Sequence, residues 1–147
     1  MSHLILTDSL RAELIVYARE AFPEEACGVL IGTRTGEAHT LTSVRAARNL
    51  HPQRENRYYL DPLEYAKAEK FCLKHANQNW RVLGFWHSHP QSAPKPSEID
   101  LKDALELEKS FPANYLYLIV SLKDQNAPEL ACWTLAVGNF AEVKLTQ

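Results

Sequence analysis

Two histidines, a serine and an aspartate lie within fourteen residues of this 147-residue chain. His87 and His89 are separated by one residue, and Ser97 and Asp100 follow after a short segment that contains prolines. Two neutral imidazoles and one carboxylate would give a tetrahedral zinc ion three ligands and leave one position for water. Water in that position ionises near neutral pH, so hydroxide becomes available for hydrolysis. The pattern therefore predicts a catalytic Zn²⁺ site with His87, His89 and Asp100 as ligands.

The segments around these residues have the composition needed to position them. Residues 82–86 are rich in β-branched and aromatic residues, which favours a strand. If that strand continues to His89, its period of two points both imidazoles to the same face. The prolines that follow end the strand, and Ser97 fits the N-cap of a helix. Asp100 then lies in the first helical turn, where a carboxylate is favoured, and can face the histidines.

Hydrolysis at such a site also needs a group that carries protons. Glu24, Glu25 and Glu98 are all candidates, because each lies near a predicted element boundary that could border the site. Spacing alone does not choose among them. Cys27 could be a nucleophile paired with a histidine, but its apolar strand favours the role of a small buried side chain.

These residues resemble the pattern of the JAMM (MPN-plus) metalloproteases, which is an upstream glutamate, then His-x-His-Pro, six residues and Ser-x-x-Asp. Every position of that pattern is present. Residues 23–32 also resemble the first strand of the family, in which the catalytic glutamate precedes a cysteine by two residues. The resemblance covers nearly the whole chain and implies that Glu25 shuttles protons and that Ser97 helps to stabilise the tetrahedral oxyanion. It implies the same three zinc ligands, His87, His89 and Asp100.

The resemblance also implies a class of substrate. Active members of the family hydrolyse amide or isopeptide bonds at the carboxyl terminus of ubiquitin or ubiquitin-like proteins. An extended tail could bind by strand addition, and small Gly-Gly residues would pass through a narrow channel. The chain is too short for the long insertions of the deubiquitinating members, and it resembles the small standalone members better. We therefore expect the tail of a ubiquitin-like sulfur-carrier protein as the substrate.

Two alternatives stay open. A zinc amidohydrolase of small peptides or amino-acid conjugates would use the same Glu25 and zinc chemistry without a protein partner. A non-catalytic MPN scaffold would assemble larger complexes, but members of that branch usually lack the ligand set that is intact here.

Length and composition fit one domain over residues 1–147, because 46% of the residues are hydrophobic and can form a substantial core. The formal net charge of −2, with both signs mixed, argues against nucleic acid or a membrane surface as the main partner. No apolar run approaches the roughly twenty residues that span a bilayer. The three cysteines are widely separated, and no amino-terminal signal precedes the first predicted helix, so we expect a cytoplasmic protein.

The periodicity along the chain predicts a mixed α/β fold. One helix is expected between Thr7 and Pro23, a second is capped by Asp61 with Pro62 at its first position, and a third opens at Ser97. Strands are expected near residues 25–32, 38–47, 82–89, 115–121, 130–137 and 141–145. Helices would flank a central mixed, largely antiparallel sheet in a three-layer-like sandwich, the JAMM/MPN, cytidine-deaminase-like architecture. The polar segment 49–57 is a candidate substrate-lining loop.

Overall fold

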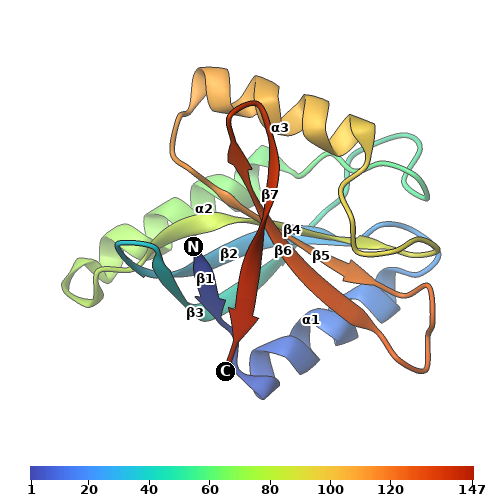
Figure 1. Cartoon of the computed structure of the whole chain (residues 1–147), viewed down its shortest axis with the longest axis horizontal. Coiled ribbons are helices and arrows are strands. Elements are labelled where there is room, and N and C mark those ends of the chain that lie inside the picture. Colours follow the sequence, from blue (N-terminus) through green and yellow to red (C-terminus); the bar gives the residue numbers. More distant parts are fainter.

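Three α-helices pack around one mixed sheet of seven strands in the computed structural model, which describes all 147 residues (Figure 1). The helices are α1 (Asp8–Ala21), α2 (Pro62–Lys74) and α3 (Glu98–Ser110), and a short 3₁₀ turn, η1 (Ala76–Gln78), follows α2. The strands are β1 (His3–Ile5), β2 (Cys27–Thr35), β3 (Ala38–Ala47), β4 (Arg81–His89), β5 (Leu116–Ser121), β6 (Glu129–Ala136) and β7 (Asn139–Thr146). None of the helices is both long and apolar enough to span a lipid bilayer.

The strands lie side by side in the order β1-β3-β2-β4-β5-β6-β7. Four of the seven neighbouring pairs are antiparallel and three are parallel. The expected mixed, largely antiparallel sheet flanked by helices is therefore confirmed. β1 also pairs with β7, which closes the sheet on itself and brings the two chain ends together (Figure 1). The sequence does not predict this closure, because three residues are too few to show the period of a strand.

Side-chain caps fix where the three helices begin. The side chain of Thr7 accepts a hydrogen bond at the start of α1, and that of Asp61 does so at the start of α2, ahead of Pro62. At α3, the Ser97 hydroxyl accepts from the backbone N–H of Asp100, and the Asp100 carboxylate accepts from the backbone N–H of Ser97. All three predicted helix starts are confirmed, and the reciprocal cap of α3 also fixes the direction of the Asp100 carboxylate.

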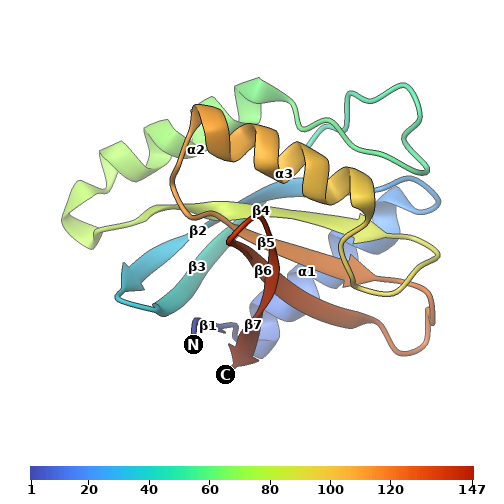
Figure 2. The same ribbon diagram turned by 45° about the horizontal axis from the view of Figure 1, so that its top comes forward.

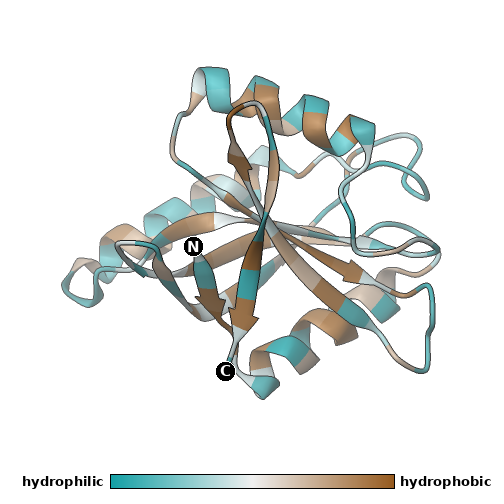
Figure 3. Ribbon diagram, viewed as in Figure 1, coloured by the Kyte–Doolittle hydropathy of each residue, from teal (hydrophilic) through white to brown (hydrophobic).

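Two apolar clusters hold the helices against the sheet. α1 contributes Leu14 and Ala18 to the larger cluster of sixteen buried residues, which also contains Trp86 of β4. α2 contributes Ala68 and Cys72 to a smaller cluster of five on β2 and β4. Figure 2 shows α2 and α3 together on one side of the sheet and α1 on the other, and Figure 3 shows the central strands mostly brown, as expected for a buried sheet.

The connection from β4 to α3 determines the position of the histidines. β4 and β5 are parallel neighbours, and α3 is the crossover between them. β4 ends at His89, and the connection must turn back towards α3 within the few residues before Ser97. The carboxyl end of β4 and the amino end of α3 therefore lie close together, on the side of the sheet that α2 and α3 cover.

Candidate metal centre

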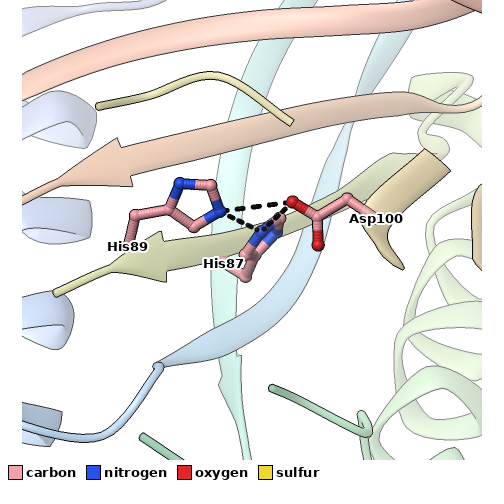
Figure 4. A group of neighbouring side chains, drawn as sticks. All are labelled: His87, His89 and Asp100. Carbon is pink, nitrogen blue, oxygen red and sulfur yellow. Dashed lines mark hydrogen bonds and ion pairs between the residues drawn. The ribbon is translucent and has the colours of Figure 1, made fainter. Parts of the chain in front are cut away.

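Three donor atoms gather at the carboxyl end of β4 (Figure 4). The Nε2 atoms of His87 and His89 are 3.1 Å apart, and they lie 3.3 and 3.2 Å from the Oδ2 atom of Asp100. Ligand atoms around a tetrahedral ion with bonds of about 2.0–2.1 Å are separated by about 3.3 Å. The three atoms thus form one face of a tetrahedron, and these residues fit a divalent metal ion such as Zn²⁺ with its fourth position open.

The imidazole of His89 is oriented by the loop that follows it. Its Nδ1 atom lies 2.8 Å from the carbonyl oxygen of Ala93, and because a carbonyl can only accept, Nδ1 carries the proton. Nε2 is then left with its lone pair directed at the other ligands. Ser121 of β5 and Trp133 of β6 donate hydrogen bonds to the carbonyl groups on either side of Ala93, at 2.6 and 3.1 Å. The sheet therefore holds the loop that orients this ligand.

The imidazole of His87 is held by an aromatic contact. The ring of Tyr58 stacks on it with a centroid distance of 4.5 Å and an interplanar angle of 23°. Tyr58 lies in the connection between β3 and α2, just after the segment predicted to line the substrate. No motif in the sequence points to Tyr58.

The pKa shifts of His87 and Asp100 favour the forms that bind a metal. Burial lowers the pKa of His87 and favours the neutral imidazole, which is the ligand form. Burial alone would raise the pKa of Asp100, but the close contacts with both imidazoles and the hydrogen bond from the Ser97 amide hold it far below its usual range. Burial likewise opposes the charged form of His89, yet Asp100 and the Ala93 carbonyl outweigh it and raise the pKa.

Glu25 is buried beside this group of ligands, immediately before β2, with 7% of its surface exposed. Burial raises its pKa to about 7; nearby His89 lowers the value and Asp100 raises it. It lines a polar cavity of about 380 Å³ together with His89 and Ser97. Among the three glutamates left open by spacing, Glu24 instead pairs with Arg54 at 3.2 Å.

The third glutamate, Glu98, is exposed at the first position of α3. Ser97 lies beside it at the rim of the same polar cavity, and its hydroxyl oxygen accepts the Asp100 amide at 3.0 Å. A hydroxyl that accepts one hydrogen bond can still donate its proton. Capping and donation to a bound substrate are therefore compatible roles for Ser97, as the sequence predicts.

The family model for prokaryotic homologs of the JAB domain, Prok-JAB, matches residues 7–136. This chain belongs to that family. The resemblance to the JAMM/MPN proteins is thereby confirmed.

Several proteins are similar to this Prok-JAB chain. It is 35% identical over 124 residues to the desampylase of Haloferax volcanii, which covers 82% of this chain and 81% of the relative. It is 27% identical over 143 residues to the CysO-cysteine peptidase of Mycobacterium tuberculosis, which covers 95% and 87%. The solution structure of a protein from Desulfitobacterium hafniense superposes with a TM-score of 0.83 at 30% identity and covers 97% of this chain and 91% of its own.

Ser88 of the Prok-JAB domain lies between the two histidines and points away from them into the sheet, with 0% of its surface exposed. Its hydroxyl accepts from the backbone N–H of Ala26 at 2.7 Å, and its own N–H donates to the Ala26 carbonyl at 3.0 Å. These two bonds attach β4 to the residue that follows Glu25. No sequence pattern points to Ser88, because its neighbours in the strand are the two histidines.

Cys27 of the same domain is packed in the sheet rather than displayed in the site. Its sulfur lies 3.9 and 3.8 Å from the backbone oxygens of Ala47 and Arg48, and it is directly opposite His87 in the pairing of β2 with β4. Burial raises the pKa of the thiol, so the thiolate is disfavoured. This environment fits the buried role that the sequence favours over a nucleophile.

The Prok-JAB site lies between two cavities of opposite character. The polar cavity with Glu25 and Ser97 borders His89, and an apolar cavity of about 450 Å³ borders Asp100 and Tyr58. Five of the six tyrosines of the chain line the apolar cavity, namely Tyr58, Tyr59, Tyr65, Tyr115 and Tyr117. An apolar ligand segment can therefore lie on one side of the candidate metal position, with polar groups on the other.

Proposed function

We propose that this protein is a zinc-dependent hydrolase that cleaves amide or isopeptide bonds at the carboxyl-terminal tail of a ubiquitin-like sulfur-carrier protein. The observation that carries the proposal is the set of three ligand atoms beside a buried glutamate. The names of the relatives support the class of activity, because one is a desampylase and another a CysO-cysteine peptidase. In this proposal His87, His89 and Asp100 hold Zn²⁺, and Glu25 and Ser97 are catalytic.

Each side chain has a defined task in the proposed reaction. A bound zinc ion supplies the Lewis acidity that makes water a nucleophile near neutral pH. Glu25 accepts a proton from the attacking water and passes it to the leaving amine, because its carboxylate lines the cavity where both must lie. Ser97 donates its hydroxyl proton to the oxyanion that develops at the scissile carbonyl. Asp100 stays ionised and neutral His87 stays a ligand, as their pKa shifts favour.

The two cavities give the tail a direction. The apolar cavity beside Asp100 takes the apolar side chains that precede the scissile bond, where tyrosine rings provide contact area. The polar cavity beside Glu25 takes the amine that leaves. Glycines next to the scissile bond let the backbone approach the candidate ligands closely, because they add no side chain at the narrowest point.

The proposal is tested with a ubiquitin-like sulfur carrier that extends beyond its Gly-Gly terminus. The carrier is incubated with zinc-loaded protein, with chelator-treated protein and with the Glu25→Gln variant, and intact mass is followed. We expect loss of the extension only with the zinc-loaded unmodified chain. If a panel of such carriers stays intact while a small amide is hydrolysed in a zinc-dependent way, the carrier assignment is wrong and the protein is an amidohydrolase of small substrates.

The Ser97→Ala variant separates the two roles of Ser97. We expect turnover to fall on the order of 10²-fold, as when one oxyanion donor is removed. Loss of the cap should also lower the free energy of unfolding by about 1 kcal/mol. The matched control is Thr7→Ala, which removes the cap of α1 far from the site. Equal turnover in the two variants, measured with the extended carrier, would leave Ser97 as a cap only.

A further inference from the structure

The side chain of Asn49 makes four hydrogen bonds just after β3. Its Nδ2 atom donates to the carbonyl oxygens of Glu25 and Arg57, each at 3.0 Å. Its Oδ1 atom accepts from the backbone N–H groups of His51 and Tyr59, each also at 3.0 Å. An amide side chain has two donor hydrogens and two acceptor lone pairs, so the bonding capacity of Asn49 is fully used. All four partners are main-chain groups, which makes the amide a fixed link.

These bonds hold together the two ends of the loop of residues 50–59. Asn49 and Leu60 form an isolated antiparallel bridge, and the Leu50 amide donates to the Tyr59 carbonyl at 2.8 Å. At the far side of the loop, the Glu25 amide donates to the Arg54 carbonyl at 2.7 Å. The loop is therefore attached to the backbone of Glu25 at two points, one of which is the side chain of Asn49.

The same side chain also fixes the residue that packs on His87. Tyr58 lies between two residues whose backbone groups bond to Asn49, and its ring stacks on the His87 imidazole. Asn49 thus connects two components of the site that come from distant parts of the chain. One is the buried carboxyl group of Glu25, and the other is the aromatic ring against a candidate ligand.

We propose that Asn49 is a positioning residue that sets the Glu25 backbone and the Tyr58 ring together against the metal ligands. The inference rests on the proposed function, because it takes Glu25 as the proton carrier. Without the amide, the Glu25 and Arg57 carbonyls lose their donor, and the backbone N–H groups of His51 and Tyr59 lose their shared acceptor. A displacement of Glu25 of about 1 Å is enough to cost about 10²-fold in rate. The three metal ligands belong to β4 and α3 and keep their own supports.

The test uses zinc-loaded full-length Asn49→Ala with three measurements. Zinc content should stay at about one per chain, and kcat on the extended carrier should fall about 10- to 100-fold with KM within about threefold, the pattern of a misplaced catalytic group. Tryptic cleavage after Arg54 or Arg57, followed by intact mass, should accelerate at least about tenfold because the loop opens. The matched control is Thr42→Ala. It removes the hydrogen bond from the Thr42 side chain in β3 to the Ile31 carbonyl in β2, away from the site.

A second variant, Asn49→Asp, keeps the two accepted bonds and lacks the two donated ones. We expect it to resist trypsin better than Asn49→Ala and to show the same loss of kcat, which would locate the effect in the two donated bonds, to Glu25 and Arg57. Turnover within about twofold of the unmodified chain in either variant would overturn the proposal, since a positioning bond must affect the rate. The tryptic rates report on the link even without carrier cleavage, and an active Glu25→Gln would instead refute the proposed function.

Discussion

Glu25→Gln is expected to lower the turnover of the zinc-loaded protein at least about 10²-fold, because glutamine keeps the size of the side chain but cannot accept and return a proton. Zinc content should not change, since the three ligand atoms come from other residues. The measurement is the initial rate of carrier cleavage, with zinc quantified in the same samples. Glu24→Gln is the matched control, because Glu24 pairs with Arg54 and does not line the polar cavity.

The pH dependence of the same two proteins makes this test sharper. The pKa of Glu25 is raised to about 7 by burial, and a dication beside it would lower that value. For a proton acceptor, kcat/KM must then fall as the pH drops through that lowered value in the unmodified protein. The residual activity of Glu25→Gln should lack this acid limb. If the acid limb were identical in both proteins, it would come from the titration of another group, such as a metal ligand. The main argument for Glu25 would then be lost.

Glu25→Gln should raise the stability of the metal-free protein although it lowers the activity of the zinc-loaded protein. Because the pKa of Glu25 is higher in the folded protein than the ordinary 4.5, the folded state keeps a proton that the unfolded state loses between pH 4.5 and about 7. Metal-free protein is therefore destabilised as the pH rises through that window. Glutamine has no charge to bury, so Glu25→Gln should raise the Tm of the metal-free protein at pH 8, the usual exchange of stability for a reactive group.

The gathering of the candidate ligands could be predicted from the sequence because these residues are close together in the chain. His87, His89, Ser97 and Asp100 belong to one strand, one loop and one helix start, and the periods of these elements determine which way each side chain points. Strand alternation placed both imidazoles on one face, and the N-cap rule placed the carboxylate beside them. The donor atoms come within 3.1 to 3.3 Å of one another in the structure.

Residues that reach the site through pairing between distant segments could not be predicted in this way. Glu25 lies beside the ligands because Cys27 pairs with His87 across β2 and β4, and spacing gives no information about that register. Only the family resemblance selected it over the other glutamates. Asn49 and Tyr58 depend on a loop closed by side-chain bonds, which no periodicity reports. The sequence indicated a loop at 49–57 but not what holds it.

His89→Ala is expected to abolish activity by removing the metal. Two remaining ligands, His87 and Asp100, should bind zinc at least about 10³-fold more weakly, because catalytic zinc sites rely on three protein ligands. The measurement is zinc per chain after dialysis against a competing chelator, with the rate of carrier cleavage alongside. His75→Ala is the matched control, because its imidazole bonds to the Phe71 carbonyl at the end of α2. Normal zinc content in His89→Ala would contradict the ligand assignment, whatever the rate.

Asp100→Asn completes the test, because it separates the charge of the third ligand from its structural role. An asparagine oxygen can still accept the Ser97 amide, so the cap of α3 should persist and the protein should stay folded. Without the carboxylate, however, the two histidines lose the anionic oxygen that would complete the donor set and balance the charge of a dication. Zinc should therefore be lost with little change in Tm of the metal-free protein. Loss of the helix together with the metal would instead mean that Asp100 acts on the site mainly through the fold.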